Sequence, residues 1–140
     1  MTQFGLIFHH LGVAVRKPEA ALAFVRGMGY GVQPPVFDPL QNVNLIMCTH
    51  ATEPAIEIIY KAEGDGPIDI HLSKHTQGLI YHSCYVSKDV EGSISALAEA
   101  GLRAVCVSQP KDAVLFGGLS VSFYQVAGLG LIEIIEESSD

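Results

Sequence analysis

The amino-acid sequence predicts an α+β domain in which one pattern of secondary structure occurs twice. Each half reads as a strand, a helix and three further strands, which is a βαβββ module. The two modules cover about residues 6–60 and 79–137, and residues 61–78 connect them. A chain of 140 residues is the usual size of one domain and needs no disulfide to fold. We therefore expect a single domain over residues 1–140, made of two tandem modules.

The first module begins with a strand-like apolar run at residues 6–15. A short helix follows, and Pro18 occupies a favoured position in its first turn. Apolar side chains recur at helical spacing until Gly27 and Gly29, which mark the end of the helix. Turn residues then separate the remaining strands of the module. These strands are expected at residues 30–37, 43–49 and 55–60.

The second module repeats this order. It begins with a strand at residues 79–86 and continues with a helix at residues 89–100, for which Gly101 supplies the C-terminal stop. A helical turn is expected around residues 68–74 of the connection. The strands that complete the second module are expected at residues 103–108, 119–126 and 129–135.

Composition and charge exclude two classes of partner. Hydrophobic residues make up 49% of the chain and charged residues only 16%, and the net charge is −7 with no basic cluster. An acidic chain of this kind is not expected to bind nucleic acid or an anionic membrane. We expect a small-molecule substrate instead. The low charge also indicates a hidden subunit interface, so a homodimer is expected.

Three further features indicate the compartment. The N-terminal segment has no basic region, and two histidines interrupt its apolar run, so no signal peptide is expected. The uncharged run at residues 113–132 contains paired glycines, which favour two strands and a turn over a membrane span. Cys48, Cys84 and Cys106 are scattered in apolar runs, as is typical of buried free thiols in a reducing compartment. The sequence therefore predicts a soluble, cytoplasmic protein.

Four polar side chains lie at matching places in the two modules. His10 and Glu57 lie in the first and last strands of the first module, and His82 and Glu133 lie in the first and last strands of the second. Each glutamate lies between two isoleucines in an apolar stretch. Because side chains alternate between the two faces of a strand, neither face is expected to be exposed to water. An unpaired buried carboxylate is costly or protonated. A single strand glutamate or histidine is usually a surface or satisfied core residue, but four at matching positions indicate a metal site.

Two imidazoles and two carboxylates suit a divalent ion of intermediate hardness. We expect one such ion per chain, bound by His10, Glu57, His82 and Glu133, and its identity is open among Zn, Ni, Co, Mn and Fe(II). An octahedral ion with four protein ligands has two positions for water or substrate oxygens. Chelation of this kind stabilises the charge that develops after removal of a proton next to a carbonyl.

Several stretches of the chain resemble the vicinal oxygen chelate superfamily, to which glyoxalases, bleomycin resistance proteins and dioxygenases belong. These stretches are HHLGVAV, AIEIIYKAEGDGPI, YHSCYV, EAGL and GLGLIEIIE. The resemblance covers about residues 7–137 and is strongest to methylmalonyl-CoA epimerase-like glyoxalases. It implies that the two modules form an incomplete barrel of mixed sheet. It also places the family's four metal ligands at the two histidines and two glutamates named above.

The resemblance implies a divalent-metal-dependent isomerase or epimerase that removes a proton next to a metal-chelated carbonyl of a small acid or thioester. Glu133 and Glu57 are the expected catalytic groups, since a ligating glutamate can detach and act as a base. Epimerases of this branch carry a second catalytic acid where this chain has Leu40, and Asp38 lies close by in the sequence. One base would serve one face of the substrate and give proton exchange with retention.

Two other functions stay open from the sequence. One is a lactoylglutathione lyase of the glyoxalase I type, although no arginine is visibly placed for the glutathione carboxylates. The other is a non-catalytic small-molecule binding or resistance protein. An extradiol dioxygenase is disfavoured because a second ligating glutamate would block an open position on the iron. His71 and His75 have helical metal spacing but favour a solvated surface, and His9 is expected on the face opposite His10.

Overall fold

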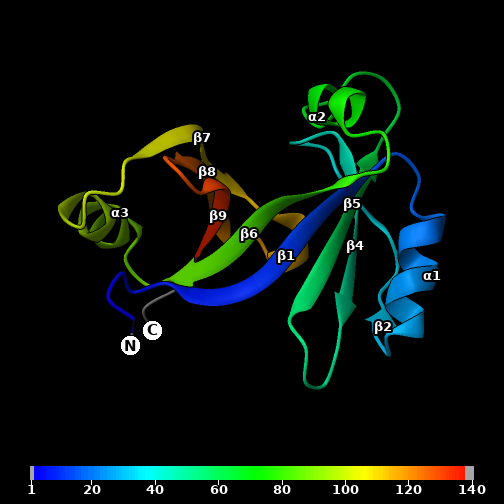
Figure 1. The fold of residues 1–140 in the computed structure, drawn as a ribbon, viewed down its shortest axis with the longest axis horizontal. Helices are drawn as coiled ribbons and strands as arrows, with labels where there is room; N and C mark the ends of the chain where they lie inside the picture. Colours follow the sequence, from blue (N-terminus) through cyan, green and yellow to red (C-terminus); the bar gives the residue numbers. More distant parts are fainter. Residues whose placement is uncertain (1, 138–140) are drawn as a thin grey trace. The chain divides into compact units, whose positions relative to one another are not determined.

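The computed structural model describes residues 2–137, except for the side chain of residue 114. Its elements follow the predicted order of strand, helix and strands in each half, with four strands after the helix in the first half and three in the second (Figure 1). The first half comprises β1 (Ile7–Val15), α1 (Glu19–Gly27), β2 (Gly31–Val32), β3 (Val36–Asp38), β4 (Val43–Thr49) and β5 (Ala55–Lys61). The connection contains α2 (Asp69–Lys74). The second half comprises β6 (Leu79–Ser87), α3 (Val90–Glu99), β7 (Ala104–Asp112), a 3-10 turn η1 (Val114–Phe116), β8 (Ser120–Val126) and β9 (Gly130–Glu136).

The chain forms two compact units whose borders fall inside strands. Unit 2 runs from His10 to Tyr81, and unit 1 consists of the residues up to His9 together with those from His82 onward. Strand β1 therefore begins in unit 1 and ends in unit 2, and β6 begins in unit 2 and ends in unit 1. The α+β fold class predicted from the sequence is confirmed. The module bounds of 6–60 and 79–137 stay a prediction.

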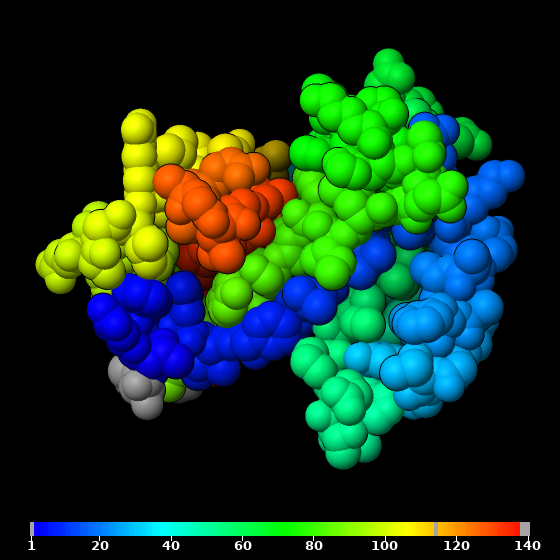
Figure 2. Space-filling model, in the orientation of Figure 1, coloured from blue at the N-terminus to red at the C-terminus, as the bar shows by residue number. Residues whose placement is uncertain are grey.

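Unit 2 contains the strand order β2-β4-β5-β1, with β3 paired to β4. Strands β1 and β5 are parallel, and the other pairs are antiparallel. Helix α1 packs on one face of this sheet through Val25, which joins Ile46, Cys48 and Ile58 in a buried cluster. Because side chains alternate along each strand, the other face of the sheet is left for different residues. The outer side of α1 lies at the surface of unit 2 (Figure 2).

Unit 1 contains the strand order β6-β9-β8-β7, with β6 parallel to β9. The Asp89 side chain caps α3 by accepting a hydrogen bond from the Gly92 backbone N–H at 3.0 Å. Val90 and Ile94 of α3 then pack against the buried cluster on one face of the sheet. Its members are Tyr124, Val126, Ile132 and Ile134. The helix again covers one face only, as α1 does in unit 2.

Two predicted strands differ from the observed ones, and prolines lie at both differences. The strand predicted at residues 30–37 is wrong as a single element, because it divides into β2 and β3 around Pro34 and Pro35, which cannot donate to a ladder. The strand predicted at residues 103–108 is too short, because β7 continues to Asp112 through Pro110. Strand β7 lies at the end of the unit 1 order, where its pairing with β8 tolerates register shifts.

The prediction that Cys106 is buried is also wrong. Cys48 and Cys84 are buried free thiols as expected, but Cys106 is exposed on β7. Its neighbours Val105 and Val107 are 45% and 54% exposed, so this part of β7 is uncovered on both faces. Within residues 2–137, the structure contains no helix with the length and apolar character needed to cross a membrane.

The packing of α1 on the unit 2 sheet predicts that one core substitution causes a large loss of stability. Ile58 is 1% exposed beneath α1, so Ile58→Ala should lower the free energy of unfolding by about 2–5 kcal/mol through lost burial and a residual cavity. Phe24 on the same helix is 69% exposed, and Phe24→Ala should change this free energy by about 0.5 kcal/mol or less. Urea titration of both variants measures the difference, and equal losses would contradict the packing described.

Candidate metal centre

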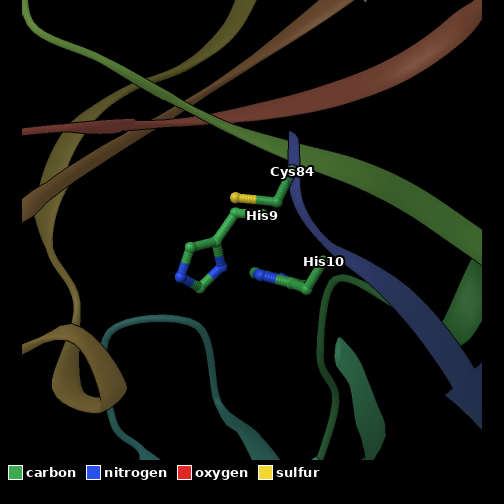
Figure 3. Close-up of side chains that lie close together, drawn as sticks. All are labelled: His9, His10 and Cys84. Atoms are coloured by element: carbon green, nitrogen blue, oxygen red, sulfur yellow. The ribbon is translucent and has the colours of Figure 1, made fainter. Parts of the chain in front are cut away.

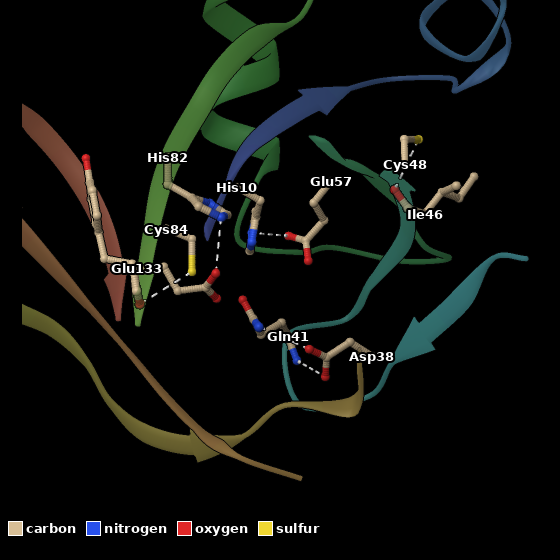
Figure 4. Close-up of polar contacts among 10 residues, drawn as sticks. His10, Asp38, Gln41, Ile46, Cys48, Glu57, His82, Cys84 and Glu133 are labelled. Atoms are coloured by element: carbon tan, nitrogen blue, oxygen red, sulfur yellow. Dashed lines mark hydrogen bonds and ion pairs between the residues drawn. The ribbon is translucent and has the colours of Figure 1, made fainter. Parts of the chain in front are cut away.

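Unit 2 brings His10 and Glu57 together on adjacent parallel strands. His10 lies in β1 and is fully buried, and Glu57 lies in β5 and is 3% exposed. The Nε2 atom of His10 and the Oε1 atom of Glu57 are 3.8 Å apart (Figure 4). The ladder pairs Glu57 with Gly12, which lies two residues after His10 and on the same face of β1. Glu57 and His10 therefore lie on the same face of the sheet.

Unit 1 builds the same arrangement from β6 and β9. His82 and Glu133 are each 3% exposed, and His82 Nε2 lies 3.3 Å from Glu133 Oε1 (Figure 4). Glu133 pairs with Cys84, which lies two residues after His82. Each unit therefore places its glutamate opposite the residue two positions beyond its histidine. The repeat seen in the sequence is a repeat in strand register, and it yields two buried imidazole–carboxylate pairs.

Both pairs lie on the sheet faces opposite those that α1 and α3 cover. In unit 2, Ile56 and Ile58 flank Glu57 and point toward the α1 cluster, so Glu57 and His10 point to the opposite face. In unit 1, Ile132 and Ile134 flank Glu133 and belong to the α3 cluster. This alternation explains the sequence puzzle of a glutamate within a run of isoleucines. One face of each strand packs under a helix, and the other carries the chemistry.

The two pairs differ in their immediate walls. In unit 1, Glu133 is paired across the sheet with Phe123, whose ring meets the His82 imidazole edge-on at 5.4 Å between centroids. In unit 2, the matching partner of Glu57 is Met47. Phe123 is 7% exposed and limits the movement of His82 and its access to water. Met47 is flexible and tolerates more adjustment beside Glu57.

Each of the four side chains carries a donor atom that suits a divalent metal ion. Imidazole nitrogen and carboxylate oxygen suit Zn, Ni, Co, Mn and Fe(II), and all four side chains are at least 97% buried. Burial of this kind is expensive for a histidine and a glutamate unless each has a partner for its polar atoms. The described residues within each unit therefore provide two of the four ligands predicted from the sequence.

His9 is a packing residue of unit 1 in this structure. Its ring meets Phe116 edge-on at 5.4 Å, and one of its ring nitrogens lies within 4.8 Å of the Cys84 sulfur (Figure 3). Cys84 is fully buried. His71 also packs against an aromatic ring, that of Tyr81 at 5.1 Å, while His75 is exposed beyond the end of α2.

The sequence indicated Asp38 beside Leu40, but it did not indicate the hydrogen bond between Asp38 and Gln41 in unit 2. Asp38, at the end of β3, is 2% exposed, and its carboxylate accepts hydrogen bonds from the Leu40 and Gln41 backbone N–H groups. It also accepts from Gln41 Nε2 at 3.0 Å (Figure 4). Leu40, which takes the place of the family's second acid, is 55% exposed. The only sign of this interaction in the sequence is an aspartate directly before a turn. A side chain that accepts hydrogen bonds from its own loop leaves no periodic pattern in the sequence.

Comparison with known proteins identifies the superfamily to which the chain belongs. Residues 9–123 match the model of the Glyoxalase/Bleomycin resistance protein/Dioxygenase superfamily. The ethylmalonyl-CoA/methylmalonyl-CoA epimerase of Cereibacter sphaeroides is 33% identical over 104 residues, which cover 74% of this chain and 77% of that protein. The chain therefore belongs to this superfamily, as its sequence indicated.

Solved structures agree on the fold. A hypothetical protein from Bacillus halodurans C-125 matches with a TM-score of 0.76 at 23% identity, and the match covers 96% of both chains. The methylmalonyl-CoA epimerase from Mycobacterium tuberculosis matches with a TM-score of 0.73 at 18% identity, over 94% of this chain and 87% of that one. At these sequence identities, the matches show a shared fold and nothing beyond it.

The burial of Cys48 and Cys84 predicts a pattern of thiol reactivity. Burial raises the pKa of the Cys48 thiol, which lowers its thiolate fraction at neutral pH, and Cys84 is fully buried. In the native protein a disulfide reagent should therefore react with one thiol per chain, Cys106, and with three after denaturation. Cys106→Ser should remove the native reaction. A second fast-reacting native thiol would contradict the assignment.

Proposed function

We propose that the protein is a divalent-metal-dependent epimerase that removes the proton next to the carbonyl of a short acyl-CoA thioester, with methylmalonyl-CoA as the first substrate to test. The observation that carries this proposal is the buried histidine–glutamate pair at the same register in both units. The epimerase from Cereibacter sphaeroides, the relative at 33% identity, supports the choice of reaction and substrate.

In this proposal His10, Glu57, His82 and Glu133 together hold one divalent ion. Bound there, the ion would polarise the substrate carbonyl and stabilise the negative charge that follows proton removal. The histidines are suited to hold their positions because they are buried, and the Phe123 ring restrains His82. The identity of the ion stays open.

Glu133 is the proposed base. Its carboxylate is buried on a rigid central strand, and Phe123 beside it limits the entry of water that would compete for the proton. Glu57, the matching carboxylate of the other unit, is the proposed second group that moves a proton. Exposed Leu40 cannot do so, since an aliphatic side chain neither accepts nor donates one. The homodimer expected from the sequence stays a prediction beside this proposal.

Metal content tests the ligand assignment directly. Purified protein should bind about one divalent ion per chain, and His10→Ala or His82→Ala should each reduce this content severely, because each removes one of four ligands. Elemental analysis after dialysis against a chelator-free buffer measures it. His75→Ala is the matched control, since this exposed histidine should be dispensable. Wild-type metal content in both ligand variants would show that the histidines do not bind the ion.

Isotope exchange tests the reaction. Metal-loaded protein should exchange the α-proton of methylmalonyl-CoA with deuterated water, and Glu133→Gln should slow this exchange by about 10²–10⁴-fold, because glutamine retains an oxygen ligand but is not a base. Mass spectrometry follows the exchange, and chiral analysis separates exchange with retention from epimerisation. Glu57→Gln should affect epimerisation more than exchange if Glu57 serves the second face.

Two outcomes would change the assignment. Undiminished exchange by metal-loaded Glu133→Gln would place the base elsewhere. Metal-loaded wild type could also fail to exchange the α-proton of methylmalonyl-CoA, of other thioesters and of 2-oxo acids. In that case the protein is better described as a small-molecule binder.

A further inference from the structure

The buried Asp38 carboxylate determines how the Gln41 side chain is oriented. Asp38 Oδ1 accepts from the backbone N–H groups of Leu40 and Gln41, at 2.9 and 3.3 Å, and Oδ2 accepts from Gln41 Nε2 at 3.0 Å. An ionised carboxylate has acceptors only, so the atom of Gln41 that faces it must be the NH₂ group. The Gln41 carbonyl oxygen, Oε1, is therefore turned away from Asp38.

The loop that carries Gln41 is held firmly at both ends. Asp38 closes its first end, and Asn42 anchors its last end by donating from Nδ2 to the Glu63 carbonyl at 3.2 Å and the Asp65 carbonyl at 2.9 Å. Gln41 itself is only partly buried, so its outward oxygen is reachable. A group fixed in this way loses little conformational entropy when it makes a hydrogen bond.

The strand register places this pair on the same side of the sheet as the unit 2 site. Asp38 pairs with Val43 on β4, and Glu57 pairs with Met47, which lies four residues further along β4 and on the same face. In Figure 4 the second carboxylate oxygen of Glu57 points toward the part of the view in which Gln41 and Asp38 lie. Gln41 thus presents a fixed acceptor toward the face that carries His10 and Glu57.

We propose that Gln41 Oε1 is a specificity-determining acceptor for an N–H group of the substrate, and that Asp38 is the positioning residue that fixes the polarity of Gln41. This inference rests on the proposed acyl-CoA function. The N–H donor of such a thioester that lies nearest its reacting carbon is the first amide of the pantetheine arm, two methylenes from the sulfur. An acceptor beside the site selects that amide.

Two probes that differ in one atom test the proposal. The first is the methylmalonyl thioester of N-acetylcysteamine, which contains the amide N–H, and the second has an ester oxygen in place of that N–H. Dissociation constants are measured by titration calorimetry with metal-loaded protein, so the readout does not depend on turnover. Wild type should bind the amide probe about tenfold more tightly than the ester probe, the ratio expected for one hydrogen bond.

Asp38→Asn should abolish this preference without removing the loop turn. The new asparagine oxygen still accepts from the two backbone N–H groups, but its NH₂ group faces the Gln41 NH₂ group. The Gln41 amide should then rotate and present a donor outward, so the amide probe loses its advantage. Adding Gln41→Glu to Asp38→Asn should restore the preference, because one oxygen of the new glutamate accepts from the asparagine and the other faces outward. The double variant keeps the wild-type total charge.

A merely structural role for Asp38 predicts a different result, namely equal losses for both probes and no rescue by the double variant. Gln41→Met, which leaves the Asp38 turn intact, should bring the two dissociation constants to within about twofold of each other. Wild type without a preference for the amide probe, or a preference that survives Asp38→Asn, would overturn the proposal. Epimerisation of methylmalonyl-CoA without amide preference would overturn it while leaving the proposed function intact. Amide preference without α-proton exchange would overturn only the function.

Discussion

The structure depends on placing a histidine and a glutamate side by side in the apolar interior of a sheet. A buried carboxylate without a partner costs several kcal/mol, and an imidazole in the same place is also penalised. Parallel pairing of the first and last strands of each unit solves this, because it puts the glutamate across from the residue two positions beyond the histidine. The remaining strands and helices can then be apolar without isolating either group.

This constraint also explains where the helices lie. If α1 or α3 packed on the face of the pairs, the apolar stripe of the helix would meet the polar groups, and no substrate could approach. Each helix instead covers the opposite face, where the isoleucines that flank each glutamate form its core contacts. Both units follow this arrangement, but the cross-strand neighbour of the glutamate is Phe123 in unit 1 and Met47 in unit 2.

The fold and the site could be predicted from the sequence to different depths. Periodicity revealed the helices and most strands, and the equal placement of His10, Glu57, His82 and Glu133 in two modules revealed the pairs. Proline effects were misjudged at Pro34 and Pro35, because an apolar run does not show which backbone N–H groups a ladder needs. The exposure of Cys106 depended on the lack of a covering element over β7, and the role of Asp38 depended on a turn closed by its own side chain. Both features depend on residues that become neighbours only in the folded chain, and the alternation of side chains along one strand does not reveal them.

The division of β1 between the two units bears on how the protein could be cut or rearranged. Leu6 and Phe8 pack in unit 1, where the Phe8 ring meets Tyr85 edge-on at 5.7 Å, while Val13 and Val15 of the same strand pack in unit 2. A fragment that ended in the connection at residues 61–78 would take these N-terminal side chains away from the second module and expose its core. The connection is therefore a poor site for splitting the chain into separately expressed halves. A circular permutation that opened the connection at its exposed residues 63–65, before the buried Ile68 and Leu72, would keep β1 whole and leave both cores complete.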